Sequence, residues 1–414
     1  MLRFVAADLR RHWIGVLAIA LIIALATALG IAVTLQERAL RLGSARAAEA
    51  FDLVVGAAGS ETQLVLSSVF LQAAPLPLMP GTVLATLIAD PRVDWAAPVG
   101  FGDFAGNAPI VGTTQPLVVG LGGLAEGRSF EQLGEAVAGS AAPFALGAKF
   151  TPLHGRVEEG GHAHGDVAYT VVGRMAPTGT PWDRAVLVPI EAIWTVHGHG
   201  EARARGPLAA LHEDHDHDAG PDLARPIDPV ALVRAGTPGL PAILVKPKTI
   251  ADAYKLRTDY RAETTLAVFP AEVLTKLYGT LGDARFILSA VAASAQGLVA
   301  AAILLVVTIH VLQRRRQIGA LRAFGAPRGV VFAIVWLESF VIVGIGVIAG
   351  FGLGYLAVRL GSAMLAKEAG FALPVELHAG DLAAVAVLLA VTAAASLVPA
   401  LLAYRQSPAT ALRA

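Results

Sequence analysis

The chain has 414 residues, of which 55% are hydrophobic and only 15% are charged, whereas an average soluble domain carries roughly 25% charged residues. Lysine and arginine together number 32, as do aspartate and glutamate, so the formal net charge is zero and no global basic field would attract nucleic acid. The absence of cysteine excludes disulfides, thiolate metal sites, cysteine nucleophiles and lipid anchors on cysteine. This composition is typical of a membrane protein with one large aqueous domain.

The first apolar run lies near the N-terminus. No charged residue occurs from Trp13 through Gln36, which exceeds the roughly 20 residues needed to cross a bilayer core. We therefore predict that residues 1–36 form a short cytoplasmic segment and the first transmembrane helix. A cleaved signal peptide is the alternative, but its apolar region normally has only about 7 to 15 residues.

A long segment of more ordinary composition follows, from residue 37 to residue 285. It alternates short β-rich runs with turn clusters, and Pro270 is well placed to begin a helix that extends to about residue 282. These signals predict a mixed α/β domain over residues 37–285. Its β-rich runs include Phe51 to Val55, Pro116 to Val119, Tyr169 to Val172, Ala185 to Val188 and Ala242 to Val245.

Histidine is concentrated in this domain. Residues 198–228 lack periodicity and alternate histidines with acids, which is typical of a mobile loop. In the absence of thiolates, imidazole and carboxylate groups are the ligands that Zn²⁺, Ni²⁺ or Cu²⁺ prefers. The segment could therefore capture a metal ion, respond to pH or be merely a solvated loop, and the sequence leaves these three interpretations open. Zn²⁺ is the cofactor hypothesis, and no covalently bound cofactor is expected. The candidate ligands are His197, His199, His212, His215 and His217, while His154, His162 and His164 lie earlier in the domain.

Three further spans are predicted in the last third of the chain, where long uncharged runs return. Only the second of these three contains an acid, Glu338, which could sit at the headgroup level, couple motion or contact a substrate. The predicted segments are a span at 286–312, a loop helix at 313–328, a span at 329–358, a loop at 359–381, a span at 382–404 and a tail at 405–414.

The arginines beside the spans give the orientation, because cytoplasmic loops carry an excess of Lys and Arg. All three arginine-rich segments fall on one side of a four-span topology, which places both termini and the 313–328 loop in the cytoplasm. The large domain and the 359–381 loop then lie outside. The arginines used are Arg3, Arg10, Arg11, Arg314, Arg315, Arg316, Arg322, Arg328, Arg405 and Arg413.

Small residues recur at four-residue spacing in two spans, which favours close helix packing in a bilayer. One set lies in the first span, at Ala20, Ala24, Ala28 and Ala32, and the other lies in the third, at Gly346, Gly350 and Gly354. Packing inside one subunit and packing between subunits are both open.

The 313–328 loop reads as a short amphipathic helix. Ile318, Leu321 and Phe324 fall along one side, and Arg314 to Arg316 form a basic flank. Such a helix could dock into a groove of a partner, whereas a positively charged hairpin that only holds topology would not need the spaced apolar residues. The chain has no phosphate-binding loop and no Ser/His/Asp or H-E-x-x-H arrangement, so we expect no ATP hydrolysis by the chain itself.

Three stretches resemble the FtsX-like/MacB-type ABC transporter permeases. They are QRRRQIGALRAFGAPR at 313–328, followed by Glu338, the C-terminal PALLAYRQSPATALR at 399–413, and the segment that begins DLVVGAAGS at 52–60. The order of one span, a large domain and three spans is also similar. The resemblance implies an α-helical membrane protein with four transmembrane helices and a mixed α/β periplasmic domain between helices 1 and 2, in a bacterial inner membrane.

The resemblance also implies partners and site residues. A separate ABC ATP-binding subunit, as in the LolC or FtsX arrangement, would bind the 313–328 helix, and the permease would form a homodimer or a pseudo-symmetric dimer. Its expected activity is to extract or export a lipoprotein, amphiphile or other periplasmic substrate. The histidines at 197–217, rather than the resemblance, make zinc a candidate regulator of this activity. A mechanotransmitter or metal-responsive receptor acting on a periplasmic or outer-membrane partner is the alternative. The coupling residues would be Arg314, Arg315, Arg316, Ile318, Gly319, Leu321, Arg322, Phe324, Gly325 and Glu338.

Overall fold

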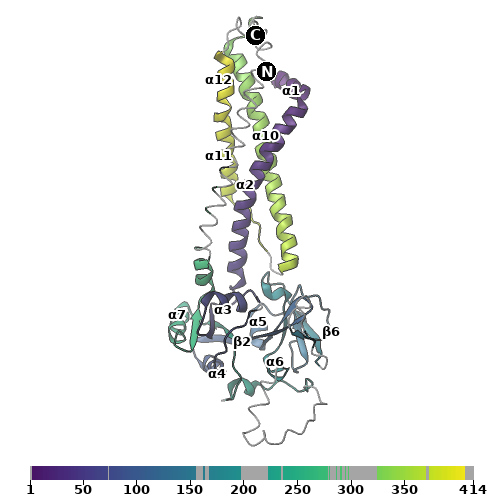
Figure 1. Cartoon of the computed structure of the whole chain (residues 1–414), viewed down its shortest axis with the longest axis vertical. Helices are drawn as coiled ribbons and strands as arrows, with labels where there is room; N and C mark the ends of the chain where they lie inside the picture. The colour runs from purple at the N-terminus through teal and green to yellow at the C-terminus, as the bar shows by residue number, and fades with distance from the viewer. Residues whose placement is uncertain are drawn as a thin grey trace, which may run out of the picture. The chain divides into compact units, whose positions relative to one another are not determined.

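A computed structural model of the chain forms two compact units (Figure 1). The first unit comprises residues 1–40, 281–363 and 374–414, and the second comprises residues 41–280 and 364–373. The residues described are 2–72, 74–154, 162–163, 167–196, 222–234, 236–277, 279, 286, 290, 294, 297, 324–369 and 373–405.

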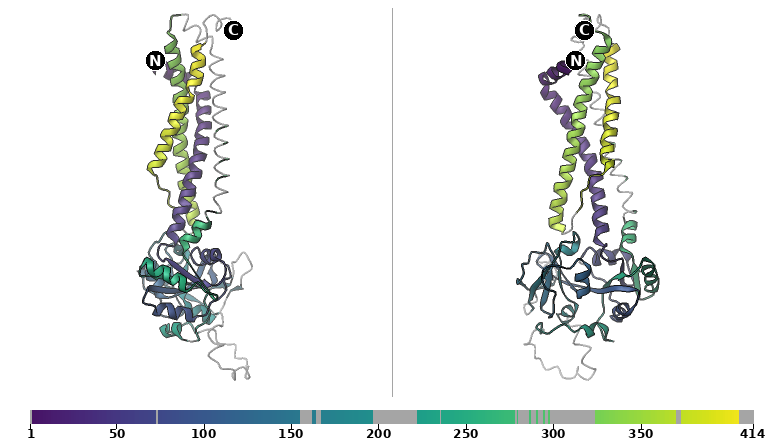
Figure 2. Two further views of the ribbon diagram at one scale, coloured as in Figure 1. Left: turned by 90° about the vertical axis from the view of Figure 1, so that its left-hand side faces the viewer. Right: turned by 180° about the vertical axis from the view of Figure 1, so that it is seen from behind.

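The first unit is helical. Its helices are α1 (Leu2–Arg11), α2 (Trp13–Ala47), α10 (Arg328–Ala369), α11 (Ala379–Ala395) and α12 (Leu397–Arg405). Figure 2 shows α2, α10, α11 and α12 running side by side in both views. Both α2 and α10 extend beyond the predicted spans, because the residues after 36 and 358 keep good helix formers and contain no proline until the helices have ended.

Within the described residues, two helices are long and apolar enough to cross a membrane, namely Trp13–Ala47 and Arg328–Met364. The predicted span at 382–404 is divided between α11 and α12. Pro399 has no N–H to donate to the carbonyl of Ala395, so the helix is interrupted at Ser396. The predicted span at 286–312 lies outside the described residues except for four positions, and the count of four spans stays a prediction.

The second unit is built on a mixed β-sheet. Its described strands follow the order β12-β1-β11-β2-β3-β10-β5-β9-β4, with β6, β7 and β8 attached to the side. Neighbours are antiparallel except for two parallel pairs, β3 with β10 and β5 with β9. The strands are β1 (Leu53–Ala57), β2 (Val93–Ala105), β3 (Ala108–Thr113), β4 (Leu124–Gly127), β5 (Glu135–Ala138), β6 (Lys149–Phe150), β7 (Leu153–His154), β8 (His162–Ala163), β9 (Tyr169–Met175), β10 (Val186–Pro189), β11 (Ala242–Pro247) and β12 (Thr265–Val268).

Short helices pack around this sheet. They are α3 (Glu61–Ser68), α4 (Thr82–Ala89), α5 (Gln115–Gly120), α6 (Ile190–Val196) and α7 (Ile250–Asp259), with the 3-10 turns η2 (Pro181–Arg184) and η4 (Pro229–Val233). Residues 270–277 are also helical and begin at the predicted Pro270. The mixed α/β character expected for this part of the chain is therefore present.

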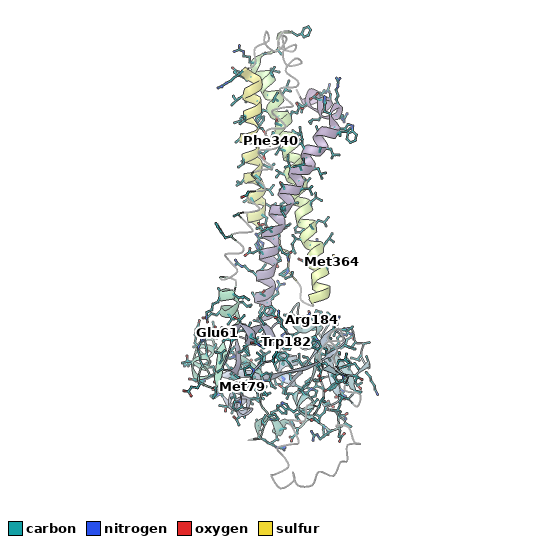
Figure 3. All side chains as sticks on the ribbon, in the orientation of Figure 1. Glu61, Met79, Trp182, Arg184, Phe340 and Met364 are labelled. Carbon is teal, nitrogen blue, oxygen red and sulfur yellow. The ribbon has the colours of Figure 1, made fainter. Side chains whose placement is uncertain are left out.

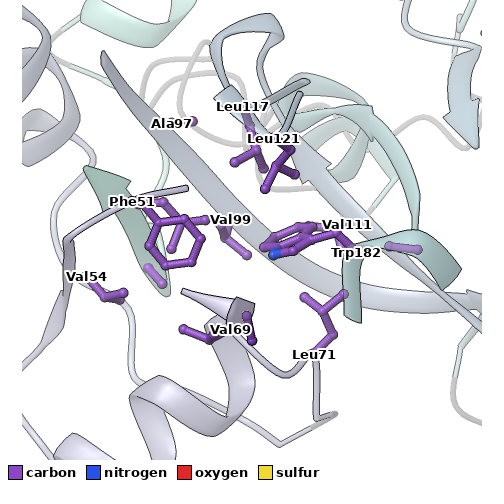
Figure 4. Close-up of a cluster of buried hydrophobic side chains, with 14 of the residues drawn as sticks. Phe51, Val54, Val69, Leu71, Ala97, Val99, Val111, Leu117, Leu121 and Trp182 are labelled. Atoms are coloured by element: carbon purple, nitrogen blue, oxygen red, sulfur yellow. The ribbon is translucent and has the colours of Figure 1, made fainter. Parts of the chain in front are cut away.

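The sheet is buried on both faces, which explains why its central strands are continuous apolar runs. In β1, Val54 packs into one hydrophobic cluster while Leu53 and Val55 pack into another. The first cluster includes Phe51, just before β1, and Trp182 of η2, as Figure 4 shows; Trp182 is also labelled in Figure 3. The fold of this unit thus depends on packing, as expected for a chain without cysteine.

The predicted strand Pro116 to Val119 is wrong, because these residues form α5. Proline is well accommodated in the first turn of a helix, where its missing N–H has no partner to lose. The helix buries Leu117 and Val118. A run of only four residues is too short for its apolar pattern to distinguish a helix from a strand.

Candidate functional site

The glycine face of α10 contacts α2. A Cβ atom added at Gly350 would lie 2.5 Å from the carbonyl oxygen of Ala24 and 2.6 Å from the Cβ of Thr27. At Gly346 and Gly354, the nearest carbonyl oxygens of α2 would lie 2.9 and 2.7 Å away. Any side chain larger than glycine would force these helices apart. The carbonyls belong to Ala20, Ala24 and Ala28, so the structure brings the two predicted small-residue faces together within one chain.

A charged cluster joins α2 to the start of α11. The Arg38 guanidinium donates two hydrogen bonds to Asp381, of 2.8 Å to Oδ2 and 2.9 Å to Oδ1. The same guanidinium lies 3.1 Å from Nδ1 of His378, whose backbone N–H donates to Asp381 at 2.8 Å. The Asp381 side chain is only 7% exposed, so this bidentate pair is shielded from water on one side. It fixes the spacing between the two helices.

Sequence analysis missed this cluster, although a signal was present. Arg38 follows the predicted first span by two residues, and Asp381 directly precedes the predicted fourth span. Opposite charges at the ends of two spans that face the same side of a membrane are candidates for pairing. Asp381 also lies in the first turn of α11, where a negative charge is favoured by the helix dipole.

The first turns of α10 pack against the last turns of α11 and α12. The Trp336 indole N–H donates to the carbonyl oxygen of Ala393 at 3.0 Å, which satisfies a carbonyl where α11 ends. Its ring stacks on Phe340, labelled in Figure 3, with centroids 5.5 Å apart. Glu338 lies on the same stretch of α10 and is half-buried. Because an α-helix turns about 100° per residue, the Glu338 side chain leaves the helix on a different side from Trp336 and Phe340.

The predicted coupling segment is described only at its end. Phe324 is 92% exposed, and Gly325 has a φ of +93°, a conformation that favours glycine. The chain therefore turns before α10 begins at Arg328. The other predicted coupling positions lie outside the described residues, namely Arg314, Arg315, Arg316, Ile318, Gly319, Leu321 and Arg322.

The predicted metal ligands also lie outside the described residues, at His197, His199, His212, His215 and His217. Of the earlier histidines, His154 and His162 are register partners in the antiparallel pair β7 and β8. Over the part of the chain that the structure describes, no group of three His, Asp or Glu side chains could hold a metal ion. Zinc binding therefore stays a prediction about the undescribed segment.

Comparisons with known proteins address the C-terminal segment. A family model described as FtsX-like permease C-terminal matches residues 289–408. Among solved structures, the chain is similar to the periplasmic region of MacB from Actinobacillus actinomycetemcomitans, with 10% identity and a TM-score of 0.31 over 56% of this chain and 95% of that chain. No curated protein matches the chain. Residues 289–408 are thus similar to the C-terminal part of FtsX-like permeases, as the motifs at 313–328 and 399–413 predict.

Proposed function

We propose that the chain is the membrane subunit of an ABC transporter and transmits the motion of a cytoplasmic ATPase to the α/β unit. The observation that carries this proposal is the family match over residues 289–408, which covers the predicted loop helix at 313–328. The chain has no phosphate-binding loop of its own, so ATP hydrolysis is assigned to a separate subunit.

The helical unit supports a mechanical role. The long helix α2, over Trp13–Ala47, makes two sets of contacts within the first unit. It contacts the glycines of α10 near Ala24, and its Arg38 pairs with Asp381 of α11. These contacts lie at different positions along α2. Helices that interlock at several points move as a body rather than bending independently. A push on α10 would therefore be passed to α2.

The full topology belongs to the same proposal. We infer four spans, with both termini in the cytoplasm of a bacterial cell and residues 37–285 in the periplasm. This topology agrees with the arginines beside the apolar runs, which all fall on the cytoplasmic side. In this arrangement the permease would act as a dimer with two ATP-binding subunits. The load would be a lipoprotein, an amphiphile or another periplasmic substrate.

Coupling through the loop can be tested with one exposed aromatic residue. Phe324→Asp is expected to release the ATP-binding subunit, because a docking contact of about 1.5 to 3 kcal/mol is replaced by a charge. Since Phe324 is 92% exposed, the fold of the permease should not change. The measurement is affinity purification from native membranes, with quantification of the copurified ATPase and its activity.

Ile250→Asp is the matched control, because Ile250 is equally apolar, is 79% exposed and lies in the α/β unit. It should leave copurification unchanged. Retention of the ATPase by the Phe324 variant at the wild-type level, with normal stimulation, would contradict the coupling role.

A metal-responsive receptor is the second candidate, and the run of histidines at 197–217 favours it. In this case zinc would change the ATPase rate without any transported cargo. Calorimetric titration of zinc into the chain should show uptake at neutral pH that weakens below about pH 6.5, where imidazoles protonate. Equal uptake by a variant with His212, His215 and His217 replaced by alanine would remove this candidate.

A further inference from the structure

The α/β unit contains a cavity of about 540 Å³ that the transport proposal does not use. It lies where the parallel strands β3 and β10 end, because Thr113 and Pro189, their last residues, both line it. The carboxyl ends of parallel strands are common places for ligand sites, since the chain leaves the sheet there and opens a crevice. The volume is in the range of sites for small organic molecules.

The walls of this cavity are apolar and held in place. Phe130 and Ile190 line it while belonging to the buried clusters on the two faces of the sheet. Trp95 of β2 is half-buried, and a Cβ atom added at Gly120 would lie 2.6 Å from its ring. The indole is therefore pressed against the backbone of α5. Leu232 of η4 completes the apolar lining on another side.

The charge of the lining has one sign. Its ionisable residues are Asp94, Glu131 and Glu191, and among the described residues that line it there is no Lys, Arg or His. Glu191, in the first turn of α6, is only 6% exposed and accepts the backbone N–H of Asp228 at 3.1 Å. Burial raises the pKa of this carboxyl group. A carboxyl group in an apolar site gains from a cation brought close to it.

Basic side chains lie near the cavity without lining it, and the positive charges of Arg225 and Arg234 oppose the rise in the pKa of Glu191. Arg234 pairs with Asp228 at 2.8 Å, and Arg128 lies 3.8 Å from Glu131 while it also binds Glu135. They do not line the cavity. Negative charge on an apolar, aromatic wall excludes anions and favours a cation with an apolar body.

We propose that this cavity binds an organic monocation with an apolar body, such as an arylalkylamine, with the ammonium group directed to Glu191 and the body against Trp95. A bare metal ion does not fit this site, since a dication needs several converging oxygen ligands and most of the wall is hydrocarbon. The proposal concerns the α/β unit alone and goes beyond the transport function.

Three probes that share a phenyl ring but differ in charge distinguish the contribution of the ligand's charge to binding from that of its apolar body. They are 2-phenylethylammonium, 2-phenylethanol and 3-phenylpropionate, titrated by calorimetry into the full chain in lipid nanodiscs, with empty nanodiscs subtracted. The cation should bind most tightly and the carboxylate least. Glu191→Gln should weaken the cation about tenfold or more, the usual effect of one charge-assisted hydrogen bond, and leave the alcohol nearly unchanged.

Glu126→Gln is the matched control, because Glu126 is an exposed carboxylate of β4 that does not line the cavity. Leu232→Trp is a second variant that fills the cavity without altering Glu191, and it should reduce the binding of both the cation and the alcohol. Thermal melting checks that each variant is folded. The proposal is overturned if no probe binds, if the three probes bind equally, or if neither cavity variant changes binding of the cation.

Discussion

Glu135 is a buried carboxylate of the α/β unit that accepts several hydrogen bonds. The Arg128 guanidinium donates to it at 2.8 Å, and the backbone N–H groups of Glu131 and Gln132 donate at 2.7 and 3.2 Å. These bonds, that from Arg128 first, lower the pKa of Glu135 to about 2. Donors from three residues converge on this buried carboxylate and hold it in place at the start of β5.

Glu135→Gln should therefore destabilise the α/β unit at pH 7, by on the order of 2 kcal/mol. The folded-state pKa is lower than the unfolded one, so the wild-type contribution is present above about pH 4.5 and is lost as the pH falls toward about 2. Protease resistance of the full chain in urea, measured between pH 7 and pH 3, should show a steeper loss for wild type than for the variant. Glu131→Gln, at a side chain 71% exposed, is the control, and equal pH slopes for Glu135→Gln and wild type would contradict the assignment.

The Arg38–Asp381 pair is the second residue-scale test. Removal of either partner leaves a partly buried charge, and each single change, Arg38→Gln or Asp381→Asn, should cost about 1.5 to 3 kcal/mol. The double variant should cost less than the sum, because the interaction can be lost only once. Melting temperatures of the purified chain in detergent measure this cycle, and strictly additive shifts would show that the pair is not coupled.

The elements explain which predictions from sequence succeed. Strands β10 and β11 fall at the predicted runs because a sheet buried on both faces demands nearly continuous apolar residues. Strand β9 was found through its β-rich start, although its residues alternate between buried and partly exposed. The prediction of a strand at the α5 segment was wrong because four apolar residues show no periodicity that distinguishes a helix from a strand.

The candidate site was predictable only in part, for a different reason. The glycine and alanine faces repeat locally along their helices, whereas Arg38 and Asp381 are 343 positions apart and no local pattern links them. The 540 Å³ cavity was not predictable either, because its walls come from many separate segments. The family motifs at 313–328 and 399–413 were recognisable as short contiguous stretches, and they fall within or overlap the matched region 289–408.

The packing of α2 against α10 gives a test at the scale of elements. Gly350→Ala places a methyl group 2.5 Å from the carbonyl oxygen of Ala24 and should cost about 1 to 3 kcal/mol by overpacking. Gly352→Ala, on the same helix, meets nothing within 4 Å and should be neutral or slightly stabilising. Thermal inactivation of the full chain in nanodiscs compares the two, and equal stability would mean that the close contact does not hold the helices.

At the scale of the whole molecule, the predicted orientation can be tested because the chain lacks cysteine. Single substitutions Glu126→Cys and Ala320→Cys introduce the only thiols. A membrane-impermeant maleimide added to intact spheroplasts should label position 126 and not position 320, since the first lies in the α/β unit and the second in the arginine-rich loop. Permeabilised cells should label both. Labelling of position 320 in intact cells would invert or abolish the four-span topology.

The unbroken helix α2 has a further consequence, which concerns angular phase. An α-helix turns about 100° per residue, so the direction in which the Arg38 side chain points is fixed by the direction in which Ala24 points, fourteen residues earlier. One alanine inserted near residue 30 would rotate Arg38 relative to Ala24 by about 100° while lengthening the helix by only about 1.5 Å. Seven inserted residues would nearly restore the phase at a much greater length. As long as α2 must keep both its contact with α10 and its ion pair with Asp381, its length can change by whole turns far more easily than by single residues.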